Sequence, residues 1–309
     1  MNRPRIVSLL PSATEIACAL GGAADLVGIS HECDFPAELR GIPVLTSSRV
    51  GNGASSGAID AAVRALVHDA LSIYAVDQRR LAELSPDLIL TQDLCRVCAV
   101  SLSDVQSAVA RLAKRSQVQI VSLQPTRLAH VLQDIETVAS ALEQPERGRE
   151  LRATLEARIA LIAERARHAR TRPRVASVEW LEPLMLGGTW MPELIELAGG
   201  EALAARAGEP APTLTLAQFQ ELRPDVVLVK PCGFDVERTL REQNLIEASL
   251  RNGLARSART YVTDGNAFFN RPGPRLVESL EILAAAIHPE LFADFRAKHR
   301  SVLVPLAEP

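Results

Sequence analysis

Four of the five cysteines in this chain lie in short polar segments that directly follow predicted β-strands. They are Cys33, Cys95, Cys98 and Cys232. Thiolates are soft ligands, and four of them suit zinc or an iron–sulfur cluster. The Cys95-x-x-Cys98 spacing would let both sulfurs reach one metal ion. The pattern therefore predicts a shared metal site formed by these thiols.

Two other interpretations of the cysteines stay open. They could be reduced thiols that contact a bound ligand, or they could have no common role. A single C-x-x-C pair also serves as a redox site, although Cys95 and Cys98 lack the aromatic-Cys-Gly-Pro-Cys setting of thioredoxin-like proteins. The fifth cysteine, Cys18, lies in an apolar helical stretch, where a buried free thiol is common.

Other residues at strand ends could contact a ligand, because open α/β sheets bind ligands beyond the carboxyl ends of their strands. His31 could be a ligand or only a hydrogen-bonding residue, and Trp190 could pack on a flat ligand or anchor the core. Arg271, in a polar segment after the predicted strand 260–263, could pair with an anionic group or belong to a plain turn. We expect ligand contacts from Ser12, His31, Trp190, Phe234, Asn266, Phe268 and Arg271.

The elements that must position these residues alternate between short apolar strands and amphipathic helices. Residues 6–10, 26–30, 88–91 and 118–123 are predicted strands, and the alternation indicates a parallel sheet with crossover helices. Ser12 and Glu15 form a capping-box pattern at the start of the first helix. Residues 54–61 are small and polar and predict a mobile loop that leads into the next helix.

The second half of the sequence resembles the first. Leu84-Ser85-Pro86-Asp87 precedes one predicted strand, and Leu222-Arg223-Pro224-Asp225 precedes another. A run without proline from Pro145 to about residue 170 predicts one helix of about 25 residues, near 38 Å long. We therefore expect an α/β protein with an N-terminal lobe at 1–142, a linking helix at 143–172 and a C-terminal lobe at 173–309.

The composition excludes several classes of protein. The net charge of −3 argues against non-specific nucleic-acid binding, which needs a basic excess. No apolar run reaches the roughly 20 residues that span a bilayer, so direct membrane insertion is not expected. The sequence shows neither a paired acid and base nor a nucleophile motif, so an enzyme is not expected. The absence of a visible leader predicts a cytoplasmic protein, or a periplasmic one if a leader has been removed.

Several segments resemble a known family. Residues 6–15, residues 84–89 and the long helix resemble the helical-backbone (class III) substrate-binding proteins of cobalamin and iron-chelate ABC importers. Residues 31–36, 93–100, 231–235 and 270–276 match a subgroup usually labelled cobalamin-binding. The resemblance implies two Rossmann-like lobes with parallel sheets and a ligand cleft between them.

The resemblance also implies a function and a partner. The ligand would be a corrinoid such as cobalamin, or a related metal chelate, and an ABC transporter permease could be the partner. Trp190 and Phe268 would pack on the macrocycle, Arg271 would meet its polar groups, and His31 or a cysteine would approach the metal. The alternative is a cytosolic metalloprotein that holds zinc or an iron–sulfur cluster through Cys33, Cys95, Cys98 and Cys232.

Overall fold

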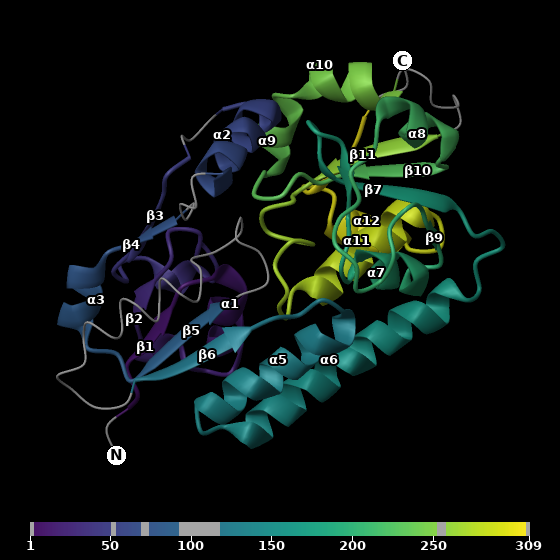
Figure 1. Cartoon of the computed structure of the whole chain (residues 1–309). Coiled ribbons are helices and arrows are strands. Elements are labelled where there is room, and N and C mark those ends of the chain that lie inside the picture. The colour runs from purple at the N-terminus through teal and green to yellow at the C-terminus, as the bar shows by residue number, and fades with distance from the viewer. Residues whose placement is uncertain (1–2, 51–53, 69–73, 93–117, 252–257, 307–309) are drawn as a thin grey trace. The chain divides into compact units, whose positions relative to one another are not determined.

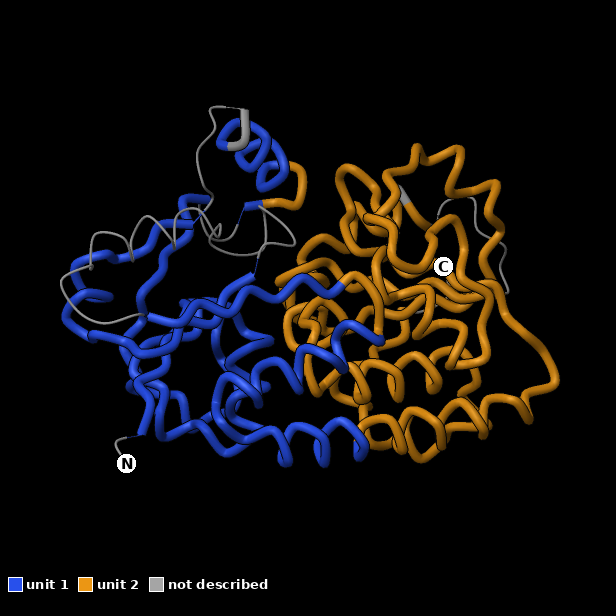
Figure 2. Tube along the Cα trace, turned by 60° about the horizontal axis from the view of Figure 1, so that its bottom comes forward, with its two compact units in different colours: residues 1–54, 58–125, 129–154 blue, residues 55–57, 126–128, 155–309 orange. Residues whose placement is uncertain are grey.

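The computed structural model describes residues 3–50, 54–68, 74–92, 118–251 and 258–306 (Figure 1). The chain divides into two compact units, shown in different colours in Figure 2. Unit 1 comprises Met1–Ala54, Ala58–Pro125 and Ala129–Thr154, and unit 2 comprises Ser55–Gly57, Thr126–Leu128 and Leu155–Pro309. Each unit is an α/β structure with its own sheet, which confirms the expected fold class. The expected lobe boundaries and the expected cleft stay predictions.

Unit 1 is built on a four-stranded parallel sheet in the order β2-β1-β5-β6. Its strands are β1 (Ile6–Ser8), β2 (Leu26–Ile29), β5 (Leu88–Gln92) and β6 (Gln119–Leu123). A separate antiparallel pair joins β3 (Thr46–Ser48) to β4 (Tyr74–Val76). Val7, Leu9, Leu45, Leu81 and Ile89 form a buried aliphatic cluster in this unit. The strands agree closely with the apolar runs seen in the sequence.

The helical elements of the N-terminal part are α1 (Pro11–Ala19), η1 (Ala23–Asp25), η2 (Ala37–Leu39), α2 (Ser56–His68), α3 (Gln78–Leu84) and α5 (Leu128–Ala141). Two sequence expectations about them were wrong. Ser12 does not cap α1, because Pro11 starts the helix one residue earlier and Leu10 takes the N-cap position without a side-chain bond. Residues 56–61 are not a loop, because they form the first turns of α2.

Unit 2 contains a larger sheet in the order β12-β11-β10-β7-β8, with β9 also paired to β7. Strands β7, β9, β10 and β11 run parallel, whereas β8 and β12 are antiparallel to their neighbours. The strands are β7 (Arg174–Trp180), β8 (Met185–Leu186), β9 (Glu201–Ala202), β10 (Val226–Val229), β11 (Arg259–Thr263) and β12 (Leu303–Pro305). The helices are α7 (Met191–Leu197), α8 (Leu216–Glu221), α9 (Val236–Leu240), α10 (Gln243–Ile246), η3 (Glu247–Arg251), α11 (Leu276–Ile287) and α12 (Ala293–Lys298).

The internal repeat extends to matching hydrogen bonds at the strand starts. The carboxylate of Asp87, before β5, accepts the backbone N–H of Arg5 at 2.8 Å. The carboxylate of Asp225, before β10, accepts the backbone N–H of Arg174 at 2.8 Å. In each unit the aspartate thus braces the strand beside its own. The order β6-β5-β1-β2 in unit 1 corresponds to β11-β10-β7-β9 in unit 2.

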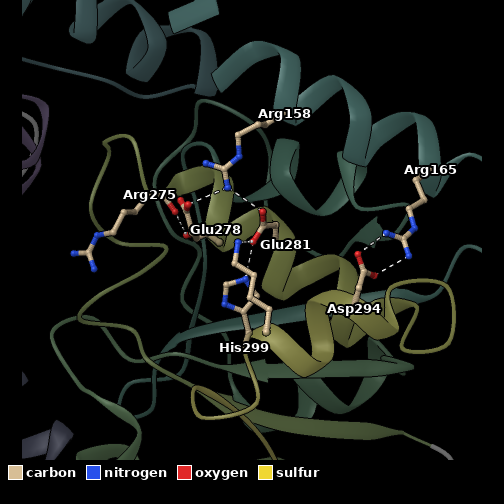
Figure 3. A network of polar contacts seen from close by, with 9 residues as sticks. Arg158, Arg165, Arg275, Glu278, Glu281, Asp294 and His299 are labelled. Carbon is tan, nitrogen blue, oxygen red and sulfur yellow. Dashed lines mark hydrogen bonds and ion pairs between the residues drawn. The ribbon is translucent and has the colours of Figure 1, made fainter. Parts of the chain in front are cut away.

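The long helix α6 (Pro145–Ala166) has 22 residues and ends earlier than expected. Within unit 2, Arg158 donates to Glu278 and to Glu281 of α11 at 2.9 Å (Figure 3). Burial alone would raise the pKa of Glu281, but bonds from His299, Lys298 and Arg158 outweigh it and lower the pKa to about 2. This network ties the second half of α6 to α11. No helix in the described ranges is both long enough and apolar enough to cross a membrane.

Candidate ligand-binding surface

An aromatic pair lies at the carboxyl ends of two central strands of unit 2. Trp180 ends β7, and Phe234 follows β10 in a tight turn in which its N–H donates to the carbonyl of Pro231 at 3.0 Å. The two ring centroids are 5.3 Å apart with the planes tilted by 56°. The guanidinium of Arg238 lies 4.2 Å from the Phe234 ring centroid, a cation–π arrangement that fixes this ring. Trp180 is only half-buried, so part of its ring remains accessible.

The end of β7 and the loops that follow β10 and β11 are bonded to one another through their backbones. The N–H of Cys232 donates to the carbonyl of Glu179 at 3.0 Å. The carbonyl of Phe234 accepts the N–H groups of Gly265 and Asn266 at 2.8 and 3.1 Å. A surface built this way is held in place before a ligand arrives, which lowers the cost of binding.

Lys230 connects the same segments through side-chain hydrogen bonds. Its side chain is completely buried, and its Nζ donates to Asn270 Oδ1 at 3.0 Å and to Glu179 Oε2 at 3.3 Å. Asn270 returns two bonds, from Nδ2 to the carbonyls of Lys230 at 3.3 Å and Gly265 at 2.8 Å. A Cβ at Gly265 would lie 2.2 Å from the carbonyl oxygen of Pro231. Only glycine therefore allows this approach.

The polar segment after β11 combines a turn with cationic and aromatic side chains. Asp264 accepts the N–H groups of Asn266 and Ala267, and burial raises the pKa of Asp264 more than these bonds lower it. Arg271, only 7% exposed, donates to Asn266 Oδ1 at 2.9 Å. Phe268 is half-buried, with the Arg275 guanidinium 5.5 Å from its centroid. The segment thus holds both a turn and groups suited to an anionic, partly aromatic ligand.

Trp190 is placed differently from Trp180. It is 6% exposed, and its Nε1–H donates to the carbonyl of Phe269 at 2.8 Å. This is the arrangement expected of a core anchor, one of the two interpretations of this residue. Its contact with a ligand stays a prediction. Trp180 was missed by sequence reasoning, because the apolar run 174–178 predicts a strand that ends at Val178, two residues before this tryptophan.

In unit 1, His31 is oriented by a hydroxyl network just beyond β2. Its Nδ1 lies 2.6 Å from Thr46 Oγ1, which also accepts the backbone N–H of His31 at 3.0 Å and lies 2.9 Å from Ser30 Oγ. The ring of Tyr74 packs 5.3 Å from the imidazole. Nε2 is itself buried and lies 3.1 Å from Glu32 Oε1, without a hydrogen bond of acceptable geometry to any described residue. The imidazole is therefore fixed through Nδ1, and its Nε2 would have to be uncovered before it could approach a metal.

Cys33 and Ser12 lie close to the start of α1. Cys33 is buried, with its Sγ 3.1 Å from Thr14 Oγ1, and Thr14 also donates to Ser8 Oγ at 2.8 Å. Ser12 is 2% exposed. Cys18 is half-buried, and burial, with a smaller contribution from Cys33, raises the pKa of its thiol to about 11. The surroundings of Cys18 therefore favour its neutral thiol over the thiolate.

The structure describes only two of the four cysteines of the predicted metal site. Cys33 is buried in unit 1 and Cys232 is half-buried in unit 2. Cys95 and Cys98 lie outside the described residues. Among the residues that are described, no group of three or more histidine, cysteine or acidic side chains is arranged to hold a metal ion. The shared cysteine site stays a prediction.

Comparisons with known proteins cover almost the whole chain. A family model described as periplasmic binding protein matches residues 6–254. The vitamin B12-binding protein of Photorhabdus laumondii is 23% identical over 287 residues, which are 92% of this chain and 88% of that protein. The expected cytoplasmic location and the zinc or iron–sulfur alternative find no support in these relatives.

Two solved structures share the fold. A periplasmic heme-binding protein from Pseudomonas aeruginosa matches with a TM-score of 0.69 at 18% identity, over 99% of this chain and 96% of that one. The periplasmic vitamin B12-binding protein of Vibrio cholerae matches with a TM-score of 0.64 at 19% identity, over 95% of this chain and 98% of that one.

Proposed function

Since this chain belongs to the periplasmic binding protein family, we propose that it captures a corrinoid or a related tetrapyrrole chelate and presents it to an ABC importer. Members of the family are substrate-binding proteins and not enzymes, which confirms the expectation that the chain is not an enzyme. The names of the relatives, vitamin B12-binding and heme-binding proteins, support a flat metal chelate as the ligand class. The permease partner and a periplasmic location are part of the same proposal.

The observation that carries the proposal is the aromatic pair of Trp180 and Phe234 at the strand ends of unit 2. Parallel sheets bind ligands at this end, and a half-buried indole offers an apolar face to a conjugated ring. Phe268 adds a second partly exposed aromatic side chain in the neighbouring segment. Loops pre-bonded to one another hold these rings in place, so binding orders little of the chain.

The polar groups around the rings suit the periphery of such a chelate. The guanidinium of Arg275 lies over Phe268, and Arg271 is held by Asn266 in the same segment. Arginine pairs well with carboxylate and phosphate groups, which tetrapyrrole ligands carry at their edges. In unit 1, the Nε2 of His31 is the candidate to approach the metal, which requires that this buried atom be uncovered when the ligand binds.

The test is a titration of the full chain with hydroxocobalamin and, separately, with hemin. Heat and visible absorption are recorded together, because a bound chelate shifts its bands when its axial ligand or surroundings change. We expect one of the two to bind with a dissociation constant of about 1 μM or tighter. If neither produces heat or a spectral change at about 100 μM, the proposed function is wrong.

A further inference from the structure

Ser55 and the first two residues of α2 belong to unit 2, although the chain on either side of these three residues belongs to unit 1. This segment, Ser55–Gly57, is here called the strap. Its small, polar sequence predicted a mobile loop. Instead Ser56 is completely buried and begins a 13-residue helix. The strap sequence does not account for this burial and helix start, so another residue of unit 2 must stabilise them.

Glu242 fastens the strap. Its carboxylate accepts the backbone N–H of Ser56 at 2.8 Å and the hydroxyl of Ser56 at 2.6 Å. Glu242 is 8% exposed and lies 186 residues away in sequence. A carboxylate at a helix N-terminus satisfies its unpaired N–H groups and suits the helix dipole. Here the capping group comes from another element, so the cap depends on tertiary structure.

Glu242 is also connected to the aromatic pair through Arg238. Arg238 donates from Nη2 to Glu242 Oε1 at 3.0 Å, and its guanidinium lies 4.2 Å from the centroid of Phe234. Phe234 in turn packs against Trp180. The carboxylate that holds Ser56 therefore also orients the cation that holds Phe234.

A second route connects the other end of the strap to the same pair. A Cβ at Gly57 would lie 2.3 Å from Glu182 Oε2, so the strap backbone and this side chain are in close contact. The carbonyl of Glu182 accepts the Nε1–H of Trp180 at 3.1 Å. The two routes close a ring of contacts that runs through the strap, Glu242, Arg238, Phe234, Trp180 and Glu182.

Resting on the chelate-binding function proposed above, we propose that Glu242 is a positioning residue of the aromatic surface and that ligand binding and strap docking stabilise each other. Phe234 is only 6% exposed and supports the half-buried Trp180, so a ligand that packs on Trp180 favours the ring orientation that Phe234 and the docked strap stabilise. Coupling between two binding events is reciprocal, so a docked strap must raise ligand affinity by the same factor.

The test compares two variants of the full chain, each of which weakens or removes a helix cap that a residue of unit 2 provides. Glu242→Gln weakens the strap cap, whereas Thr215→Ala removes the side-chain cap of α8, where Thr215 Oγ1 accepts the N–H of Gln218 at 3.2 Å. We expect Glu242→Gln to weaken binding of hemin or hydroxocobalamin about tenfold, and Thr215→Ala to change it less than about twofold. Ser56→Ala, which keeps the backbone N–H, should weaken it about threefold and serves if Glu242→Gln does not fold.

Hydrogen exchange provides the second readout. In the wild-type chain, the chelate should slow exchange at the backbone amides of residues 56–58, and in Glu242→Gln it should not. The proposal is overturned if Glu242→Gln and Thr215→Ala bind the chelate equally well. It is also overturned if the chelate does not change hydrogen exchange at the strap of the wild-type chain.

Failure of the proposed function gives a different result. If the wild-type chain binds neither chelate, tryptophan emission of the unliganded variants still decides the role of Glu242. A changed emission in Glu242→Gln but not in Thr215→Ala supports positioning of Trp180 by Glu242. Identical emission in both variants refutes it.

Discussion

The two units begin their strands alike and end them differently. Asp87 and Asp225 accept the same backbone bond at the same distance of 2.8 Å, one in each unit. Past the strands, unit 2 carries Trp180 and Phe234, whereas unit 1 carries the His31 imidazole with a hydroxyl network. The repeated parts are the ones that build the sheet. The parts that diverge lie where α/β sheets bind ligands, so each unit carries a different set of groups at its strand ends.

The largest expected effect concerns the buried network that ties α6 to α11. Glu281→Ala leaves Arg158, Lys298 and His299 facing one another without their carboxylate. We expect the free energy of unfolding to fall by about 4 kcal/mol, measured by urea denaturation. Glu83→Ala, which removes an exposed ion pair on α3 of unit 1, is the control and should leave the unfolding midpoint unchanged. Equal effects in the two variants would contradict this account.

Acid should weaken the same network. The pKa of Glu281 is about 2 in the folded chain, below its ordinary value of 4.5. A lowered folded pKa contributes stability above the unfolded pKa, and this contribution is lost as the pH falls through the folded one. We expect about 3 kcal/mol to disappear between pH 4.5 and pH 2. The difference in unfolding free energy between the wild-type chain and Glu281→Gln should shrink over that range, and a constant difference would refute the assignment.

The matched aspartates test the repeat itself. Asp87→Ala and Asp225→Ala each remove a charged acceptor from a backbone N–H at a strand start. We expect each to lower the free energy of unfolding by about 2 kcal/mol, because bonds to charged groups contribute about that much. Thermal and urea unfolding would measure both. A loss confined to one variant would show that the matching geometry does not carry matching energy.

The smallest expected effect concerns the hydroxyl that orients His31. Thr46→Val removes the partner 2.6 Å from Nδ1 while keeping the shape of the side chain. If Nε2 approaches the metal, hemin affinity should fall about tenfold, or ~1.4 kcal/mol, since groups that orient a metal ligand contribute at this level. The visible spectrum of the bound chelate should change as well. Unchanged affinity and spectrum would restrict metal approach to other residues.

Much of the scaffold follows from the sequence because it depends on local signals. Apolar runs predicted the strands β1, β2, β5, β6, β7, β10 and β11 but not the short strands β3, β4, β8, β9 and β12, and the repeated Pro-Asp pairs marked equivalent strand starts. Ser12 failed as a cap because Pro11 already fits the first helical position. The strap failed as a loop because its stabilising partner, Glu242, lies 186 residues away and no local pattern reveals it.

The candidate site was predicted less completely for the same reason. Strand-end reasoning named Phe234 and His31 as candidates, since both lie in segments that follow apolar runs. It named Trp190 and missed Trp180, and it could not show that Trp190 is buried, because burial is decided by packing against distant segments such as the one containing Phe269. The bond from Trp190 to that carbonyl is not visible in either local sequence.

The two tryptophans therefore offer the most direct test of the central claim, that Trp180, supported by Phe234, binds the chelate. Calorimetric titration of Trp180→Ala and Trp190→Phe with hemin and hydroxocobalamin would compare an accessible ring with a buried one. The account predicts at least about tenfold weaker binding for Trp180→Ala and a change within about twofold for Trp190→Phe. Wild-type affinity in Trp180→Ala would contradict it.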